Sequence, residues 1–117
     1  MEIILHIQKY ILHLHNKKHN IMNIGIAIRN IRKERMPQLN QSEFAKKIGI
    51  TQTYLSQIET GAKTPNISVL ETISKEFEIP LPIIFWLGIS EEDITEHKRE
   101  YFRFLKPTVD SMINEFF

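Results

Sequence analysis

The chain has 117 residues, enough for one small domain with a short extension and a single modest core. It contains no cysteine, which excludes a disulfide framework and a thiolate metal site and fits the reducing cytoplasm, the localisation we expect. The formal net charge is only +1, but seven basic residues oppose three acidic ones between Ile24 and Lys63, where attraction to phosphate is expected.

Residues 1–23 form an N-terminal arm that differs from the rest of the chain. Its apolar residues fall at helical spacing and predict a short amphipathic helix: Ile4, Ile7, Ile11 and Leu14. Alternation within residues 3–7 leaves a strand possible. No basic stretch precedes the apolar run and polar residues interrupt it, which argues against a signal peptide and a membrane span. Because Met22 would make a natural start, residues 1–21 are interpreted as a dispensable extension.

Two histidines of this arm, His15 and His19, lie four residues apart, a spacing that can bind a metal on one helix face. No further ligand lies at a suitable distance, so we expect solvated histidines and no metal site. The chain also shows no cluster of Ser, His and Asp, no paired carboxylates and no glycine-rich phosphate loop. We therefore expect neither an enzyme nor a bound cofactor.

Beyond the arm, the pattern predicts helices only. A basic helix with an apolar stripe covers residues 24–36 and ends before a proline. Asn40 is a typical N-cap, with Glu43 in the capping-box position, and it starts a short helix over residues 41–48. Gly49 ends that helix, since glycine readily adopts a positive φ.

A further helix is capped by Thr51 and is predicted to end at Gly61. A break at residues 65–66 precedes the next helix, whose predicted buried stripe is formed by Ile67, Leu70, Ile73 and Phe77. Residues 83–87 form a short apolar turn. Its Trp86 is expected to pack in the core rather than to stack on a ligand.

Two short helices joined at Gly49 are typical of a helix-turn-helix. Their close crossing needs a small residue, which Ala45 supplies. The positions that must face inward are all apolar: Phe44, Ile48, Ile50, Leu55 and Ile58. No proline and no charge at a buried position interrupts the run from Gln41 to Thr60. The second helix also carries uncharged hydrogen-bonding residues on its polar face, where an ordinary solvated helix carries charges.

The stretch from Ile26 to about Leu87, centred on NQSEFAKKIGITQTYLSQIETGAKTPNISVLETISKEF, resembles the phage-repressor-like (Cro/XRE) helix-turn-helix family. Residues at family positions are Gln41, Ala45, Gly49, the SQIE run of residues 56–59, and Gly61. The resemblance implies an all-α fold with a five-helix DNA-binding domain over residues 24–88. We expect residues 1–23 to form an arm and residues 89–117 to form a helical tail.

In this family the third helix lies in the major groove with its N-terminal residues over the bases. Carried over to this chain, the resemblance implies four base-reading residues: Gln52, Thr53, Ser56 and Gln57. It also implies contacts to the phosphate backbone from Gln41, Thr51, Tyr54, Lys63 and Asn66, although Tyr54 is equally open to packing. Because this helix face offers no Arg or Lys for guanine, we expect an A·T-leaning half-site.

The tail begins at Ser90, which is expected to cap a helix with three acidic residues in its first turn. The apolar side of this helix is predicted to comprise Ile94, Tyr101, Phe102 and Leu105. After Pro107 a second helix is predicted, apolar at Val109, Met112, Ile113, Phe116 and Phe117. So much apolar surface needs a cover. We favour a second copy of the chain; packing on the chain's own domain and binding of another protein are the alternatives.

Together these features indicate a sequence-specific transcriptional regulator that binds double-stranded DNA and acts as a dimeric repressor, without a membrane partner. Phosphate contacts would set its position on DNA, and the uncharged helix face would set the sequence that it reads. The alternative is an antitoxin, or another protein-interaction module, built on the same helix-turn-helix fold.

Overall fold

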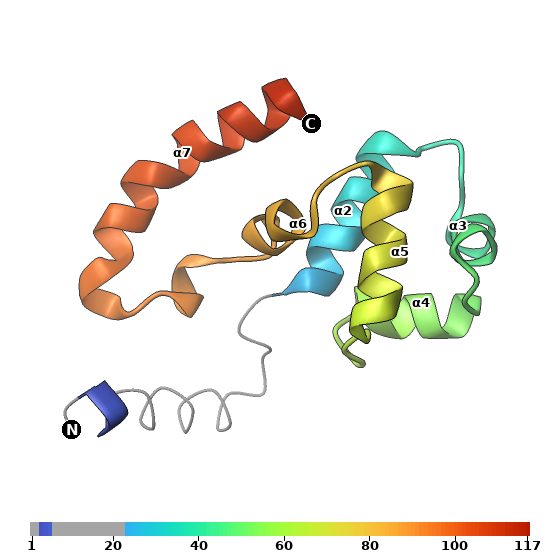
Figure 1. The fold of residues 1–117 in the computed structure, drawn as a ribbon, viewed down its shortest axis with the longest axis horizontal. Coiled ribbons are helices and arrows are strands. Elements are labelled where there is room, and N and C mark those ends of the chain that lie inside the picture. Colours follow the sequence, from blue (N-terminus) through green and yellow to red (C-terminus); the bar gives the residue numbers. More distant parts are fainter. Residues whose placement is uncertain (1–2, 6–22) are drawn as a thin grey trace.

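The computed structural model describes residues 3–5 and 23–117 (Figure 1). The sequence-based predictions for residues 6–22, including the arm helix, the histidine pair and the start at Met22, lie outside these residues. From residue 23 onward the regular structure consists of α2 (Ile24–Arg35), α3 (Gln41–Ile48), α4 (Gln52–Glu59), α5 (Ile67–Phe77), α6 (Leu81–Leu87), the 3-10 turns η1 (Glu91–Asp93) and η2 (Glu96–Lys98), and α7 (Arg99–Phe116). No helix in the described part of the chain is both long and apolar enough to cross a membrane.

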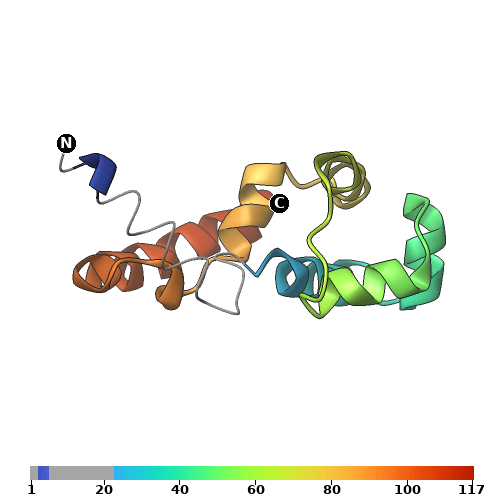
Figure 2. The same ribbon diagram turned by 90° about the horizontal axis from the view of Figure 1, so that it is seen from below.

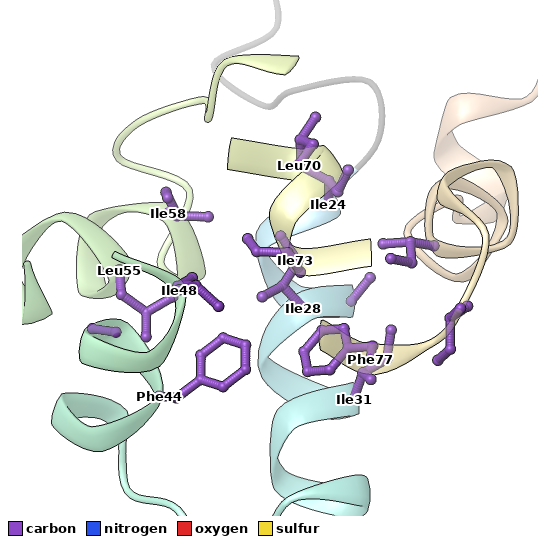
Figure 3. Packing of buried hydrophobic residues seen from close by; sticks show 14 residues of the cluster. Ile24, Ile28, Ile31, Phe44, Ile48, Leu55, Ile58, Leu70, Ile73 and Phe77 are labelled. Carbon is purple, nitrogen blue, oxygen red and sulfur yellow. The ribbon is translucent and has the colours of Figure 1, made fainter. Parts of the chain in front are cut away.

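Five helices, α2 to α6, enclose one hydrophobic core (Figure 3). Ile28 of α2, Leu55 of α4 and Ile73 of α5 are fully buried in it. The ring of Phe44 from α3 stacks on that of Phe77 from α5, with 5.2 Å between the ring centroids. The all-α fold and the five-helix domain predicted from the sequence are therefore confirmed.

The helix boundaries follow local signals in the sequence. Asn40 and Glu43 form the predicted capping box, in which the Glu43 N–H donates to Asn40 Oδ1 at 2.8 Å and the Asn40 N–H donates to Glu43 Oε1 at 3.3 Å. The prediction for Ile67 was wrong, because this residue is exposed. At about 100° per residue, Ile67 lies roughly 85° from the centre of the stripe formed by the other three apolar residues of α5.

The tail differs from its prediction in two ways. Ser90 does not open a long helix: its N–H and hydroxyl both bind Asp93 Oδ2, at 2.8 and 3.2 Å, and close the short turn η1. Pro107 does not separate two helices, because α7 continues through it. Pro107 is exposed, so the carbonyl oxygen that loses its N–H partner can be solvated, and the fixed φ of proline is compatible with a helix.

One contact joins the two ends of the five-helix domain, and two others join the domain to the tail. The Asn23 N–H donates to the Gly88 carbonyl oxygen at 2.9 Å, which joins the start of α2 to the end of α6. Trp86 is half-buried; its ring lies 5.6 Å from that of Phe102, and its Nε1–H donates to Asp110 Oδ1 at 2.9 Å. Trp86 therefore joins α6 to α7. Figures 1 and 2 show α7 at one end of the molecule and α3 with α4 at the other.

Candidate DNA interface

The turn between α3 and α4 holds the two helices close together. Gly49 adopts the left-handed conformation, with φ of 79°, and its N–H donates to the carbonyl groups of Ala45 and Lys46. The Ile50 N–H also donates to the Ala45 carbonyl oxygen, at 3.0 Å. Ala45 is buried, and Ile50 is partly buried against the core, as predicted. This arrangement is a helix-turn-helix, with α4 as the second helix.

The C-terminal half of α4 is fixed against α2 by direct backbone contact. A Cβ atom at Gly25 would lie 1.9 Å from the Ile58 carbonyl oxygen, a distance that no side chain can tolerate. Gly25 is buried within α2, so the glycine is needed for close approach and not for a special φ. The position of α4 relative to the core thus depends on a residue that the sequence did not single out.

A buried ion pair ties α4 to α2 and α3. Arg32 donates from Nε and Nη2 to the two carboxylate oxygens of Glu59, each at 2.8 Å. Gln41 of α3 donates from Nε2 to Glu59 Oε1 at 2.9 Å. The prediction that no charge occupies a buried position between Gln41 and Thr60 was therefore wrong, because Glu59 is buried.

Every buried side-chain donor and acceptor of the described residues has a hydrogen-bond partner, including those of this network. The hydrogen bond to Glu59 raises the pKa of Arg32 above its ordinary value, and the charge of Glu59 adds to the rise, whereas desolvation acts against it. The contact with Glu59 therefore favours the charged form of Arg32. The Arg32–Glu59 pair and Gln41 connect three helices at the end of α4 opposite to its N-cap.

The N-terminal turn of α4 is left free by these anchors. Thr51 caps the helix, as predicted, through a 3.0 Å hydrogen bond from the Tyr54 N–H to its hydroxyl oxygen. Gln52 and Thr53 are exposed, and Ser56 and Gln57 are half-buried one turn further along. At about 100° per residue, these four residues span an arc of about 140° on the side away from Leu55 and Ile58. The predicted base-reading residues are thus brought together on one helix face.

The residues predicted to contact phosphate surround this face. They differ in their exposure and in how many of their polar groups already hold hydrogen bonds. Lys63 is exposed in the loop after α4. Asn66 is also exposed, but its Oδ1 accepts a 2.9 Å hydrogen bond from the Val69 N–H and caps α5. Tyr54 packs its ring against the core and remains half-exposed. Gln41 is half-buried, and its amide nitrogen donates one hydrogen to Glu59, so its second amide hydrogen, its amide oxygen and its backbone N–H are left for a ligand.

Comparison with known proteins identifies this arrangement. The sequence profile described as helix-turn-helix matches residues 28–84, a range that contains all nine predicted site residues. Residues 28–84 belong to the helix-turn-helix family. It is 35% identical over 81 residues to the immunity repressor protein of Bacillus phage phi105, covering 68% of this chain and 52% of that protein.

Two further relatives are similar to this chain. The ImmF control region 10 kDa protein of phage phi105 is 36% identical over 61 residues, covering 52% of this chain and 66% of the relative. The HTH-type transcriptional regulator SinR of Bacillus licheniformis is 36% identical over 75 residues, covering 63% of this chain and 62% of that protein. The chain thus spans about half to two thirds of the length of these relatives. No solved structure matches it.

Sequence reasoning missed Gly25, Arg32 and Glu59, although a weak signal for the ion pair was present. Arg32 lies four residues after Ile28, on the apolar stripe of α2, and Glu59 directly follows the buried Ile58. Two opposite charges placed on apolar stripes are candidates for a buried pair, because an unpaired charge is rarely buried. The close approach at Gly25 left no such signal.

Proposed function

We propose that this helix-turn-helix protein is a sequence-specific regulator of transcription that binds double-stranded DNA and represses as a dimer. The observation that carries the proposal is the exposed, uncharged N-terminal face of α4, a helix held from behind by the Gly25–Ile58 contact and the buried Arg32–Glu59 pair. A helix held in this way can enter the major groove without rearranging the domain. Relatives named as an immunity repressor and as a transcriptional regulator support the same function.

Four side chains of α4 are assigned to the bases. Gln52 can donate to adenine N7 and accept from adenine N6, and the methyl group of Thr53 can pack on a thymine methyl group. Ser56 and Gln57 lie deeper on the same face and would reach the bases further along the groove. None of these side chains supplies the bidentate Arg–guanine contact, so the selected half-site is expected to be rich in A·T pairs.

The surrounding residues are assigned to the phosphate backbone. Lys63 supplies a mobile positive charge, and the hydroxyl groups of Thr51 and Tyr54 can donate to phosphate oxygens. Asn66 and Gln41 stand at the N-termini of α5 and α3, where free backbone N–H groups favour an anion. Because the side chains of Gln41 and Asn66 already hold hydrogen bonds, we assign their phosphate contacts to backbone N–H groups and the remaining amide atoms.

The experiment that tests the function is a selection from randomised duplex DNA at near-physiological salt. We expect a palindromic site whose half-site centres lie about 10 bp apart, or a multiple of this spacing. A Gln52→Ala variant should lose about 5- to 150-fold in affinity for that site, since one bidentate base contact contributes about 1–3 kcal/mol. Its matched control is Asn30→Ala, which removes an exposed amide from α2, a helix that carries none of the assigned residues.

The two variants separate base reading from general effects. If Asn30→Ala binds as the wild type does and Gln52→Ala loses affinity mainly for the selected sequence, Gln52 reads bases. If the wild type enriches no sequence and shows only salt-sensitive binding, the DNA-reading function is refuted and a protein-interaction module such as an antitoxin becomes the better assignment.

A further inference from the structure

The tail helix α7 presents a broad exposed face. When Arg99 is placed at 0° and each residue adds about 100°, this face extends over about 100–260°. Another side of the helix, at about 300–320°, carries the buried Phe102 and Ile113, and Phe102 packs against Trp86 of α6. The exposed face bears five large apolar side chains, here called the exposed stripe: Tyr101, Phe104, Leu105, Met112 and Phe116. Each of them is 49–81% exposed, so the stripe lies open to solvent.

Within residues 23–117, such exposure is concentrated in the tail. In α2 to α6 and their connections, only two large apolar side chains are exposed, Ile26 and Ile67, whereas α7 and the residue after it expose six. The described residues of the arm do not cover the stripe, because residues 3–5 are themselves exposed. The stripe spans residues 101–116, about 22 Å of helix. An open apolar stripe of this length on one helix indicates a helical partner.

Two acidic side chains lie on one edge of the stripe. Glu100 stands at about 100° and Glu115 at about 160°, so they border the stripe near its two ends, about 22 Å apart along the helix. Both are exposed, and neither forms an ion pair with a described residue. This edge therefore offers two uncompensated negative charges.

The basic residues of α7 lie on the other side of the helix, at about 340–40°, and all of them are engaged within the chain. Arg103 pairs with Glu91, and Lys106 pairs with Asp110 at 2.6 Å. Arg99 donates to two backbone carbonyl groups of the preceding turn, each at 3.0 Å. A second copy of α7 thus has no positive charge to place beside the two glutamates. DNA or an anionic lipid surface would be repelled by them.

We propose that the exposed face of α7 binds a basic amphipathic helix of another protein. The apolar side of that helix packs on the exposed stripe, and Lys or Arg residues along one edge of it pair with Glu100 and Glu115. Trp86 and the buried side of α7 hold the face in place before binding, which lowers the entropy cost of binding. The proposal does not rest on the proposed function, because α7 carries none of the nine residues assigned to DNA and lies at the other end of the molecule from α3 and α4 (Figures 1 and 2).

The test measures binding of a designed helical peptide to the full chain, without DNA. The peptide has about 18 residues, a stripe of leucines, and two lysines about 15 residues apart on one edge of that stripe, which matches the spacing of the two glutamates. Its matched control has glutamates in place of these lysines. In fluorescence anisotropy, the wild type should bind the lysine peptide at least about tenfold more tightly, because the exchange turns two attractions into two repulsions.

Two pairs of charge variants test the acidic edge. Glu100→Gln combined with Glu115→Gln should weaken binding of the lysine peptide about 2- to 30-fold, the range expected for two exposed ion pairs. Glu34→Gln combined with Glu71→Gln is the matched control and should bind as the wild type does. These two glutamates lie on α2 and α5, are exposed and form no ion pair with a described residue, and their replacement changes the net charge equally.

A further pair of variants tests the stripe. Leu105→Gln should weaken binding of the lysine peptide at least about tenfold, because it removes an apolar side chain from the middle of the interface. Ile26→Gln is its control and should bind as the wild type does, since Ile26 and Leu105 are 48% and 52% exposed but Ile26 lies on α2. Amide hydrogen exchange should slow in α7 when the lysine peptide binds and stay unchanged in α4.

Each of the following results would overturn the proposal. Equal binding of the two peptides, or equal losses from the two glutamate pairs, would show that the acidic edge does not select the partner. Failure of the wild type to bind the lysine peptide at about 1 mM would show that the stripe does not accept such a helix. A wild-type dimer that Leu105→Gln dissociates would assign the stripe to a second copy. None of these results affects selection of a palindromic DNA site, so the proposed function is tested separately.

Discussion

Removing one partner of the Arg32–Glu59 pair is expected to destabilise the domain more than most other single substitutions. The side chains of Arg32 and Glu59 are 9% and 2% exposed, so neither can exchange its partner for water. Glu59→Leu deletes two hydrogen bonds of 2.8 Å to a guanidinium group. At about 1.5–3 kcal/mol for a hydrogen bond to a charged group, the loss is about 3–6 kcal/mol. It agrees with the roughly 3–5 kcal/mol typical of broken buried pairs.

Urea unfolding measures this loss. With an m-value of about 1–1.5 kcal/mol/M, a loss of 3 kcal/mol or more lowers the midpoint by at least about 2 M. Arg32→Met should cost a similar amount, because it leaves a carboxylate buried with Gln41 as its remaining partner. The double variant, Arg32→Met with Glu59→Leu, should lie within about 1 kcal/mol of the wild type, since similar apolar volume replaces both charges.

The matched control is the exposed pair between Lys47 and Glu76, whose charged atoms lie 2.7 Å apart. Glu76→Gln should cost less than about 1 kcal/mol, because the lysine side chain is 53% exposed and can be solvated. Additive losses from the two single variants in the Arg32/Glu59 double variant, or a loss below 1 kcal/mol in Glu59→Leu, would refute the reasoning.

Three further outcomes are expected. Gly25→Ala should destabilise the domain by about 1–3 kcal/mol in urea despite the better helix propensity of alanine, because its Cβ would force α2 away from the Ile58 carbonyl group; equal stability would contradict the contact. Glu78→Gly should stabilise it by about 0.5–1 kcal/mol in a thermal melt, because Glu78 ends α5 with a φ of 56°; a lower melting temperature would disprove this. Trp86→Phe keeps a ring against α7 but loses the hydrogen bond to Asp110, so amide hydrogen exchange should accelerate in α7 and not in α2. Equal acceleration in both helices would contradict the role of Trp86 in holding α7 on α6.

Much of the fold was predictable because its signals are local. Asn40 and Thr51 mark the starts of their helices, because their side chains accept hydrogen bonds from backbone N–H groups three residues later. Gly49 is compatible with the positive φ that the turn requires. The apolar spacing of α3 and α4 then places Phe44 and Leu55 in the core. Each of these signals is contained within a few residues.

The remaining features depend on partners that are distant in the sequence. Glu59 is buried because it pairs with Arg32, which lies 27 residues earlier in the chain. No local sequence pattern predicts which two charged residues will form this pair. Pro107 reads as a helix breaker, but the packing of Phe102 and Ile113 on either side of it holds α7 as one helix. The roles of the nine site residues stay predictions, although the four assigned to bases share one face of α4.

The hydrogen bond between Asn23 and Gly88 has a consequence for how such proteins can diversify. Because the chain enters and leaves the helical domain at one corner, whatever is attached before Asn23 or after Gly88 emerges there, on the side of the C-terminal end of α4 and away from its N-cap, Thr51 (Figure 1). Extensions of different lengths can therefore be joined to the same helix-turn-helix domain without covering the N-terminal turn of α4, which carries the residues that we assign to the bases. This chain covers only 52–66% of the length of each of the three relatives, so the parts of those proteins outside the match can differ in this way.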